Sequence, residues 1–516
     1  MTPLKILPIR MQKAFAMFLT PFASFGQCLM FALLATLVLW LAQGLYPKFA
    51  APLSWDSFGY IEFHAFRSGL YPAFLRLFGD ATLHNYQPIL DRIIATHLTI
   101  HLLAVGFMLW ALARVRMPIA VLVIFFVALL GNYQSQAYHN IIRTESLGYS
   151  MVCFIIAGLA LWFHSRQYRW LALAMTAGML IFGMRPNSLP LPFGIIIVAL
   201  CHIAYTAWRA RGAWRATIKP IAKALAAVML PLIIVGGFEH AYYHAHHTQR
   251  SQRLLETHLF GKAVIVLATQ DDEQLSRDDE QWYSDDLKPF MQRHRELFQA
   301  DRDRYGGRGE VCLWLTMHAI YEDSIYAKAH NEGLTVAPLE WTLGVFATYP
   351  ATTARIIAQH YLNFFCVSRI AIADPPVLGN EFLRPDLTTK PFGRGKLIFR
   401  TLVAWAFVGL GIGFFISKAW YATLWVRRSL AFVSSRFTAP APLTPLEALG
   451  SGCIMLAFGF NLFICIFGVP YLRFLATSYP FIVLGVLLMM VMIAMRLTSH
   501  KPNYATHSAT HPAIKE

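Results

Sequence analysis

The chain has 516 residues, of which 56% are hydrophobic and only 14% are charged, and its mean hydropathy is +0.47. A soluble globular protein needs more polar surface than this composition provides, so the composition excludes that class and predicts a membrane protein. The formal net charge is +16. No basic stripe with interleaved aromatic residues lies outside the short loops, so we assign this charge to membrane topology and contact with anionic membrane lipids, and expect no nucleic-acid partner.

Apolar runs long enough to cross about 30 Å of hydrocarbon as helices recur along the chain. The longer runs lie near 27–46, 93–113, 145–163, 188–206, 221–238, 401–417, 447–468 and 476–495, and two shorter ones near 117–131 and 169–184. The first run lacks a convincing cleavage site, so we interpret it as an uncleaved span. The predicted fold class is an all-α membrane protein with about ten transmembrane helices.

Lys and Arg in the short loops predict the orientation, because basic loops are retained on the cytoplasmic face. With the N-terminus in the cytoplasm, every short basic loop falls on that side. These loops contain Lys5, Arg10 and Lys13, Arg114 and Arg116, Arg166 and Arg169, the cluster from Arg209 to Lys223, Lys418, Arg427, Arg428 and Arg436, and Arg496 and Lys501. We therefore expect both termini in the cytoplasm.

The predicted spans divide the chain into unequal parts. About seven spans occupy residues 1–238, with a first outer loop at 47–90, and about three more occupy 401–500. Residues 239–400 form a polar outer segment, for which we expect a small, mainly helical domain, and 501–516 a disordered tail. Within the outer segment, the stretch from Trp341 to Phe365 is amphipathic with an interruption at Tyr349-Pro350, which favours an interfacial helix. Only Cys312 and Cys366 lie on the outer side, and a disulfide between them stays an open question.

The first outer loop contains the densest group of candidate residues, from Ser54 to Tyr60 and from Arg67 to Pro72. Asp56 lies among aromatic residues at a membrane surface, where partial desolvation raises the pKa of a carboxylate toward the range of a general base. The structural alternative for Asp56 is an N-cap of the following helix.

Three further groups occur where apolar runs end. Arg143, Thr144 and Glu145 precede the fourth span, Arg185 lies between the fifth and sixth, and Arg473 precedes the last. Arginine suits phosphate oxygens because its planar fork donates two hydrogen bonds and stays charged. The structural alternatives are a helix N-terminus stabilised by Thr144 and Glu145, and arginines that anchor helices at the membrane surface.

Taken together, these groups resemble the GT-C superfamily of integral-membrane glycosyltransferases, which includes protein O-mannosyltransferases and the aminoarabinose transferases that modify lipid A. The matching segments are Asp56 followed by Arg67 to Pro72, Thr144-Glu145, Arg185-Pro186, and Tyr471 to Phe474 leading into Pro480. Seven spans before a large outer segment are also similar to the common module of that superfamily.

The resemblance implies an inverting transferase in a bacterial inner membrane, with its active site on the periplasmic face. The donor would be a single sugar on polyprenyl phosphate, and the acceptor a hydroxyl of a glycan, lipid or protein. Asp56 would be the base, helped by Glu145, which would orient acceptor or sugar, while Arg185, Arg473 and Arg143 would bind the donor phosphate. Tyr60, Arg67, Tyr71 and Tyr471 would position the substrates. No cofactor is implied and no metal ligands are assigned, although some members of the superfamily need a divalent metal.

Two other functions remain open at this stage. An enzyme similar to the O-antigen ligases would transfer a whole glycan from a pyrophosphate carrier. A transporter would carry ionisable groups near the middle of the membrane, broken spans or repeated halves.

Overall fold

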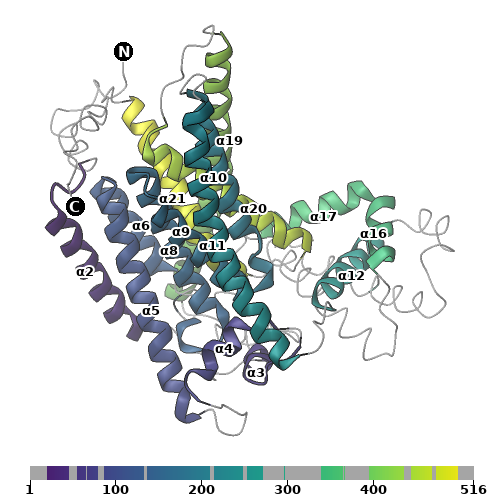
Figure 1. The fold of residues 1–516 in the computed structure, drawn as a ribbon. Coiled ribbons are helices and arrows are strands. Elements are labelled where there is room, and N and C mark those ends of the chain that lie inside the picture. Colours follow the sequence, from purple (N-terminus) through teal and green to yellow (C-terminus); the bar gives the residue numbers. More distant parts are fainter. Residues whose placement is uncertain are drawn as a thin grey trace.

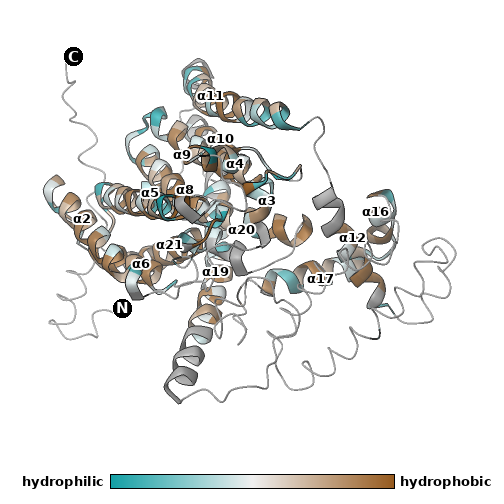
Figure 2. Ribbon diagram, turned by 90° about the horizontal axis from the view of Figure 1, so that it is seen from below, coloured by the Kyte–Doolittle hydropathy of each residue, from teal (hydrophilic) through white to brown (hydrophobic). Residues whose placement is uncertain are grey.

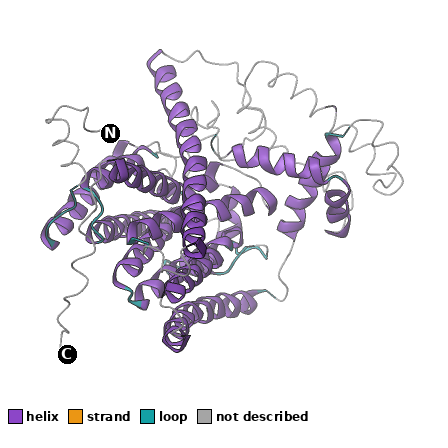
Figure 3. Cartoon of the chain, turned by 90° about the horizontal axis from the view of Figure 1, so that it is seen from above, coloured by secondary structure: helices purple, strands orange, loops and turns teal. Residues whose placement is uncertain are grey.

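The computed structural model describes residues 20–45, 55–65, 67–79, 87–132, 136, 138–209, 214–247, 253–270, 296, 339–363, 365, 394–434, 443–467 and 472–497. Within these ranges the regular structure is helical and no strand occurs (Figure 3). Five predicted features lie outside the described residues: the tail predicted to be disordered, most of the predicted outer domain, Tyr471, Cys312 and Cys366.

The long helices of the bundle follow the apolar runs of the sequence (Figure 1). They are α2 (Phe25–Ala42), α5 (Gln87–Arg114), α6 (Ile119–Gly131), α8 (Thr144–Ser165), α9 (Tyr168–Met184), α10 (Pro190–Arg209), α11 (Trp214–His246), α19 (Arg394–Ser434), α20 (Pro445–Phe467) and α21 (Leu472–Leu497). Short helices connect or flank them: α3 (Trp55–Ile61), α4 (Leu70–Arg76), α12 (Arg253–Ala268), α16 (Leu339–Thr348) and α17 (Pro350–Asn363), with 3₁₀ turns η2 (Gln43–Leu45), η3 (Tyr138–Asn140) and η4 (Pro186–Ser188).

The described residues confirm the all-α class, and 8 of their helices are long and apolar enough to cross a membrane, as a multi-pass membrane protein requires. The two shorter predicted runs are also helices: α6 has 13 residues and α9 has 17. Both are apolar, but each is shorter than the roughly 20 residues that a typical span needs.

Helix α8 is the centre of the bundle. The apolar window of this helix is 89% buried, and it packs against α5, α9, α20 and α21. Close contact with α9 depends on Gly158, because a Cβ atom there would lie 2.7 Å from the carbonyl oxygen of Trp170. The central position of α8 means that residues at its ends are surrounded by protein on several sides.

The helix that follows the run near 401–417 is longer than predicted. Lys418, Arg427 and Arg428 were expected in a loop after this run, but all three lie within α19, which contains the candidate span Trp405–Leu430. The apolar residues after Lys418 continue the helix, and aromatic rings surround the Lys418 ammonium group. A single lysine in such surroundings does not end a span, because cation–π contacts replace part of its hydration.

The described remainder of the outer segment is helical and lies beside the bundle (Figure 1). The amphipathic stretch predicted near 341–365 is two helices, α16 and α17, which meet at Tyr349-Pro350 as the sequence indicates. Helix α17 packs against α20, and α12 contacts α16, α17 and α20. The outer segment therefore contacts the C-terminal part of the bundle.

Candidate functional site

The first loop folds back over one end of the helix bundle. Helices α3 and α4 lie there between α11 and α20 (Figure 2), and α4 contacts α9 and α11. The Ser57 hydroxyl donates a hydrogen bond of 2.7 Å to the carbonyl oxygen of Ile142, just before α8 begins. This bond attaches the first candidate segment of the sequence to the second.

Tyr60 is the central side chain of this contact. Its hydroxyl lies 3.4 Å from Thr144 Oγ1 and accepts a hydrogen bond of 3.4 Å from Arg67 Nη1. The Arg67 guanidinium carbon lies 4.5 Å from the centre of the Tyr60 ring, a cation–π distance. Gly59 permits this approach, since a Cβ atom at that position would lie 2.9 Å from Arg67 Nε.

Glu145 and Arg185 form an ion pair of 3.4 Å, and both side chains are almost fully buried, with 4% and 8% of their surface exposed. Glu145 lies in the first turn of α8, where a carboxylate also faces the positive end of the helix dipole. Arg185 has an extended backbone at the end of α9, the conformation that a following proline imposes. The pair joins residues from the second and third candidate segments of the sequence inside the protein.

Arg143 and Tyr71 lie within electrostatic range of this pair. Burial raises the pKa of the Tyr71 hydroxyl well above its usual value; nearby Tyr60 and Glu145 raise it further, and Arg143 lowers it. Tyr71 therefore remains protonated, and its hydroxyl lies 3.3 Å from Nε2 of His97. Arg143 itself is buried and is the N-cap residue of α8, without a side-chain capping bond.

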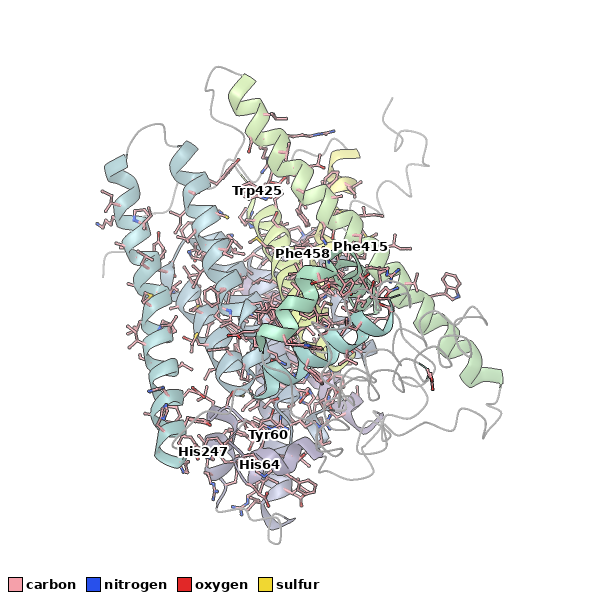
Figure 4. The ribbon with its side chains drawn as sticks, turned by 90° about the vertical axis from the view of Figure 1, so that its right-hand side faces the viewer. Tyr60, His64, His247, Phe415, Trp425 and Phe458 are labelled. Carbon is pink, nitrogen blue, oxygen red and sulfur yellow. The ribbon has the colours of Figure 1, made fainter. Side chains whose placement is uncertain are left out.

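The end of α11 anchors the loop that carries these residues. Glu239 Oε1 accepts a hydrogen bond of 3.2 Å from the Gly69 amide, and the Tyr243 hydroxyl donates to the Ala65 carbonyl oxygen. His247 Nε2 lies 2.7 Å from the carbonyl oxygen of Phe63. His247 and Tyr60 lie at the same end of the molecule in Figure 4. These α11 residues were not predicted as part of the site; their aromatic and polar character at a helix end was the available signal.

A buried group of histidines extends from Tyr71 into the bundle. The rings of His101 and His139 are 3.9 Å apart, and His139 Nδ1 lies 2.6 Å from the Ser146 hydroxyl. Burial, together with His101 and His97, holds the pKa of His139 well below its usual value. His139 is therefore neutral at physiological pH. His139 was not among the predicted site residues.

The structure thus brings together most of the predicted site residues that it describes. The group comprises Tyr60, Arg67, Tyr71, Arg143, Glu145 and Arg185. Asp56 lies on α3 and Arg473 on α21, but the side chains of both are outside the described part, as is Tyr471. Asp56 follows the first residue of α3, so its backbone is inside the helix. Among the described residues, no three His, Cys, Asp or Glu side chains form a metal-binding group.

Comparisons with models of protein families, with curated proteins and with solved structures give no match. The function is therefore inferred from the chemistry of the site.

Proposed function

We propose that this protein is an inverting glycosyltransferase of the GT-C type that moves a single sugar from polyprenyl phosphate to an acceptor hydroxyl. The reaction would take place at the periplasmic face of a bacterial inner membrane. In this proposal α6 and α9 also cross the membrane, which gives ten spans, and the outer segment forms a small domain above them. The first seven spans form the common module of the superfamily.

The observation that supports the proposal is the buried Glu145–Arg185 pair beside Arg143, Tyr60 and Arg67. A donor phosphate needs cationic partners, and the departing phosphate gains negative charge that a guanidinium group stabilises. A carboxylate beside the guanidinium holds it in place and orients a sugar or acceptor hydroxyl. Arginines that only anchor a helix in a membrane extend toward water, whereas Arg185 points into the protein.

The residues divide between the two halves of the reaction. Arg185, Arg143 and Arg473 would bind the donor phosphate, and Asp56 would remove the proton from the acceptor hydroxyl. Tyr60 and Tyr71 supply hydroxyl groups that position the sugar, together with Arg67 and Tyr471. Any divalent metal would have to be bound with the help of the substrate phosphate or of residues outside the described part.

The decisive experiment compares donors with the purified protein. Turnover of a polyprenyl-monophosphate sugar with inversion at the anomeric carbon is the expected result. Turnover of a pyrophosphate-linked glycan instead would favour the O-antigen-ligase type of enzyme. Absence of turnover with either donor across a broad acceptor screen would contradict the proposal.

A transporter is the second candidate, because the structure contains ionisable groups inside apolar helices. Lys418 lies within the candidate span Trp405–Leu430, and His97 and His101 are fully buried in α5. Such groups mark solute or proton pathways in many membrane proteins. Solute flux into proteoliposomes, without transfer of sugar, would favour this candidate.

A further inference from the structure

Lys418 is surrounded by aromatic side chains from three helices. Its ammonium nitrogen lies 3.7 Å from the ring centre of Phe458 on α20 and 5.1 Å from that of Phe415 on α19. Two further ring centres lie at 5.2 and 5.5 Å, those of Tyr361 on α17 and Phe414 on α19. Phe415 and Phe458 lie close to each other beside α17 in Figure 4. We call Lys418 with these four rings the Lys418 cage.

The cage lies deep in the apolar part of the bundle. Arg428 and Glu447 form an ion pair of 2.8 Å that joins α19 to α20. Lys418 lies ten positions from Arg428, and Phe458 lies eleven positions from Glu447, so the cage lies about 15 Å along both helices from this pair.

A counter-charge for Lys418 is missing from the described part of the chain, where its interactions are those with the four rings. Aromatic faces stabilise a cation, but they do not neutralise it. An ionisable group at this depth in a membrane protein normally pairs with an opposite charge or a polar partner. An opposite charge for Lys418 can therefore come only from outside the described residues.

Two buried polar groups adjoin the cage. The Tyr361 hydroxyl has no hydrogen-bond partner in the described part of the structure, although Tyr361 is only 7% exposed. Asn461 has 0% exposure, and neither of its amide atoms has a partner there. Phe458, Asn461 and Cys465 occupy positions i, i+3 and i+7 of α20, hence one face. Tyr361 contacts Phe458 and lies within electrostatic range of Cys465, so that face is directed toward Tyr361.

We propose that Lys418, Tyr361 and Asn461 form a binding site for a lipid head that combines a phosphate with a hydroxyl group. The phosphate oxygens accept hydrogen bonds from the Lys418 ammonium and the Tyr361 hydroxyl and supply the negative charge. The Asn461 amide both donates and accepts, which suits a phosphate oxygen together with a hydroxyl. Phosphoglycerol and phosphosugar heads both have this chemistry. The proposal does not depend on the transferase function, because α17, α19 and α20 contribute none of the residues around Glu145.

Access for a lipid comes from the outer face of α19. Ile412, Phe415 and Ile416, which precede Lys418 on this helix, are exposed. In a membrane this face is in contact with lipid tails, so a lipid chain lies next to the position where its head would meet the ammonium group. A soluble phosphate would have to cross the same apolar layer without a chain to carry it, which favours a lipid as the source.

The test is native mass spectrometry of the purified full chain, loaded with an equimolar mixture of phosphatidylglycerol, phosphatidylcholine and a polyprenyl phosphate sugar. We expect one of the two lipids with a phosphate and free hydroxyls to be retained about fivefold over phosphatidylcholine, because phosphatidylcholine has the phosphate but no head-group hydroxyl for the Asn461 amide, and one neutral hydrogen bond contributes about that factor. Which of the two is retained identifies the source of the head group. Lys418→Met and Tyr361→Phe should lower that retention by about tenfold.

Arg427→Met is the matched control, since Arg427 is an exposed basic residue on the same helix. It should retain the lipid as the unmodified protein does. If Lys418→Met does not fold, Tyr361→Phe decides, because it removes a single oxygen atom. Equal retention of phosphatidylcholine, or full retention by Tyr361→Phe, would overturn the proposal.

Discussion

The Glu145–Arg185 ion pair gives the most direct test of the candidate site. At the observed separation of 3.4 Å, two unit charges in an effective dielectric of about 20 attract each other by about 5 kcal/mol. Desolvation cancels part of this attraction, but removing one partner leaves the other charge buried. Glu145→Gln and Arg185→Gln should therefore each lower the free energy of unfolding by about 3–5 kcal/mol. The double variant should lose less than the sum, with a coupling of about 1–3 kcal/mol.

The assay is a double-mutant cycle, with unfolding in detergent followed by circular dichroism and with sugar transfer measured on the same samples. Glu447→Gln is the matched control, because it breaks a buried ion pair with Arg428 that lies away from the site. The control should lose stability and keep its turnover per folded molecule, while both site variants should lose turnover. Additive losses, with a coupling below about 0.5 kcal/mol, would show that the two charges do not interact. Equal turnover in site and control variants would refute their role in transfer.

The remaining predictions concern packing, pH and the base. Gly158→Ala should cost about 1–3 kcal/mol of stability, because its Cβ would meet the Trp170 carbonyl oxygen at 2.7 Å; Gly148→Ala, in open space on the same helix, should be neutral or slightly stabilising in the same thermal assay. The lowered pKa of His139 means that the unfolded chain binds a proton that the folded protein does not. Stability should therefore fall as the pH drops below about 6.5, by up to about 1.4 kcal/mol per unit for this group, and His139→Gln should flatten the dependence of the melting temperature on pH. Asp56→Asn should abolish transfer and leave donor binding intact, so turnover at the original rate would remove its assignment as the base.

The sequence was sufficient to place the helices, because the length and composition of an apolar run depend on residues that are adjacent in the chain. The runs predicted near 145–163 and 447–468 differ by only a few residues from α8 and α20. The end of α19 was predicted too early because a lysine in an apolar run is normally a sign of its end. What prolongs α19 past Lys418 is contact with rings on other helices, including Phe458, which lies 40 positions further along the chain.

The difference between local sequence patterns and contacts between distant residues also explains which parts of the candidate site were predictable. Membrane helices end at the surfaces of the bilayer, so polar residues at the ends of successive runs fall on one side or the other by simple alternation. This reasoning placed Arg143, Glu145 and Arg185 on a common side. It could not pair Glu145 with Arg185, because the rotation of α8 and α9 about their own axes depends on packing at positions such as Gly158.

The way in which the end of α11 anchors the first loop was harder to predict from the sequence, because its side chains bind backbone atoms of the loop. Glu239 and His247 contact the Gly69 amide and the Phe63 carbonyl oxygen, groups that every residue type presents in nearly the same way. The sequence does not show which backbone groups take part in such bonds. The positive φ of 52° at Phe63, which is uncommon for a phenylalanine, is visible only in the structure. The first loop is thus held over the end of α8 by residues 170 or more positions away. Its geometry, and with it the position of Asp56, is a property of the folded bundle and not of the loop alone.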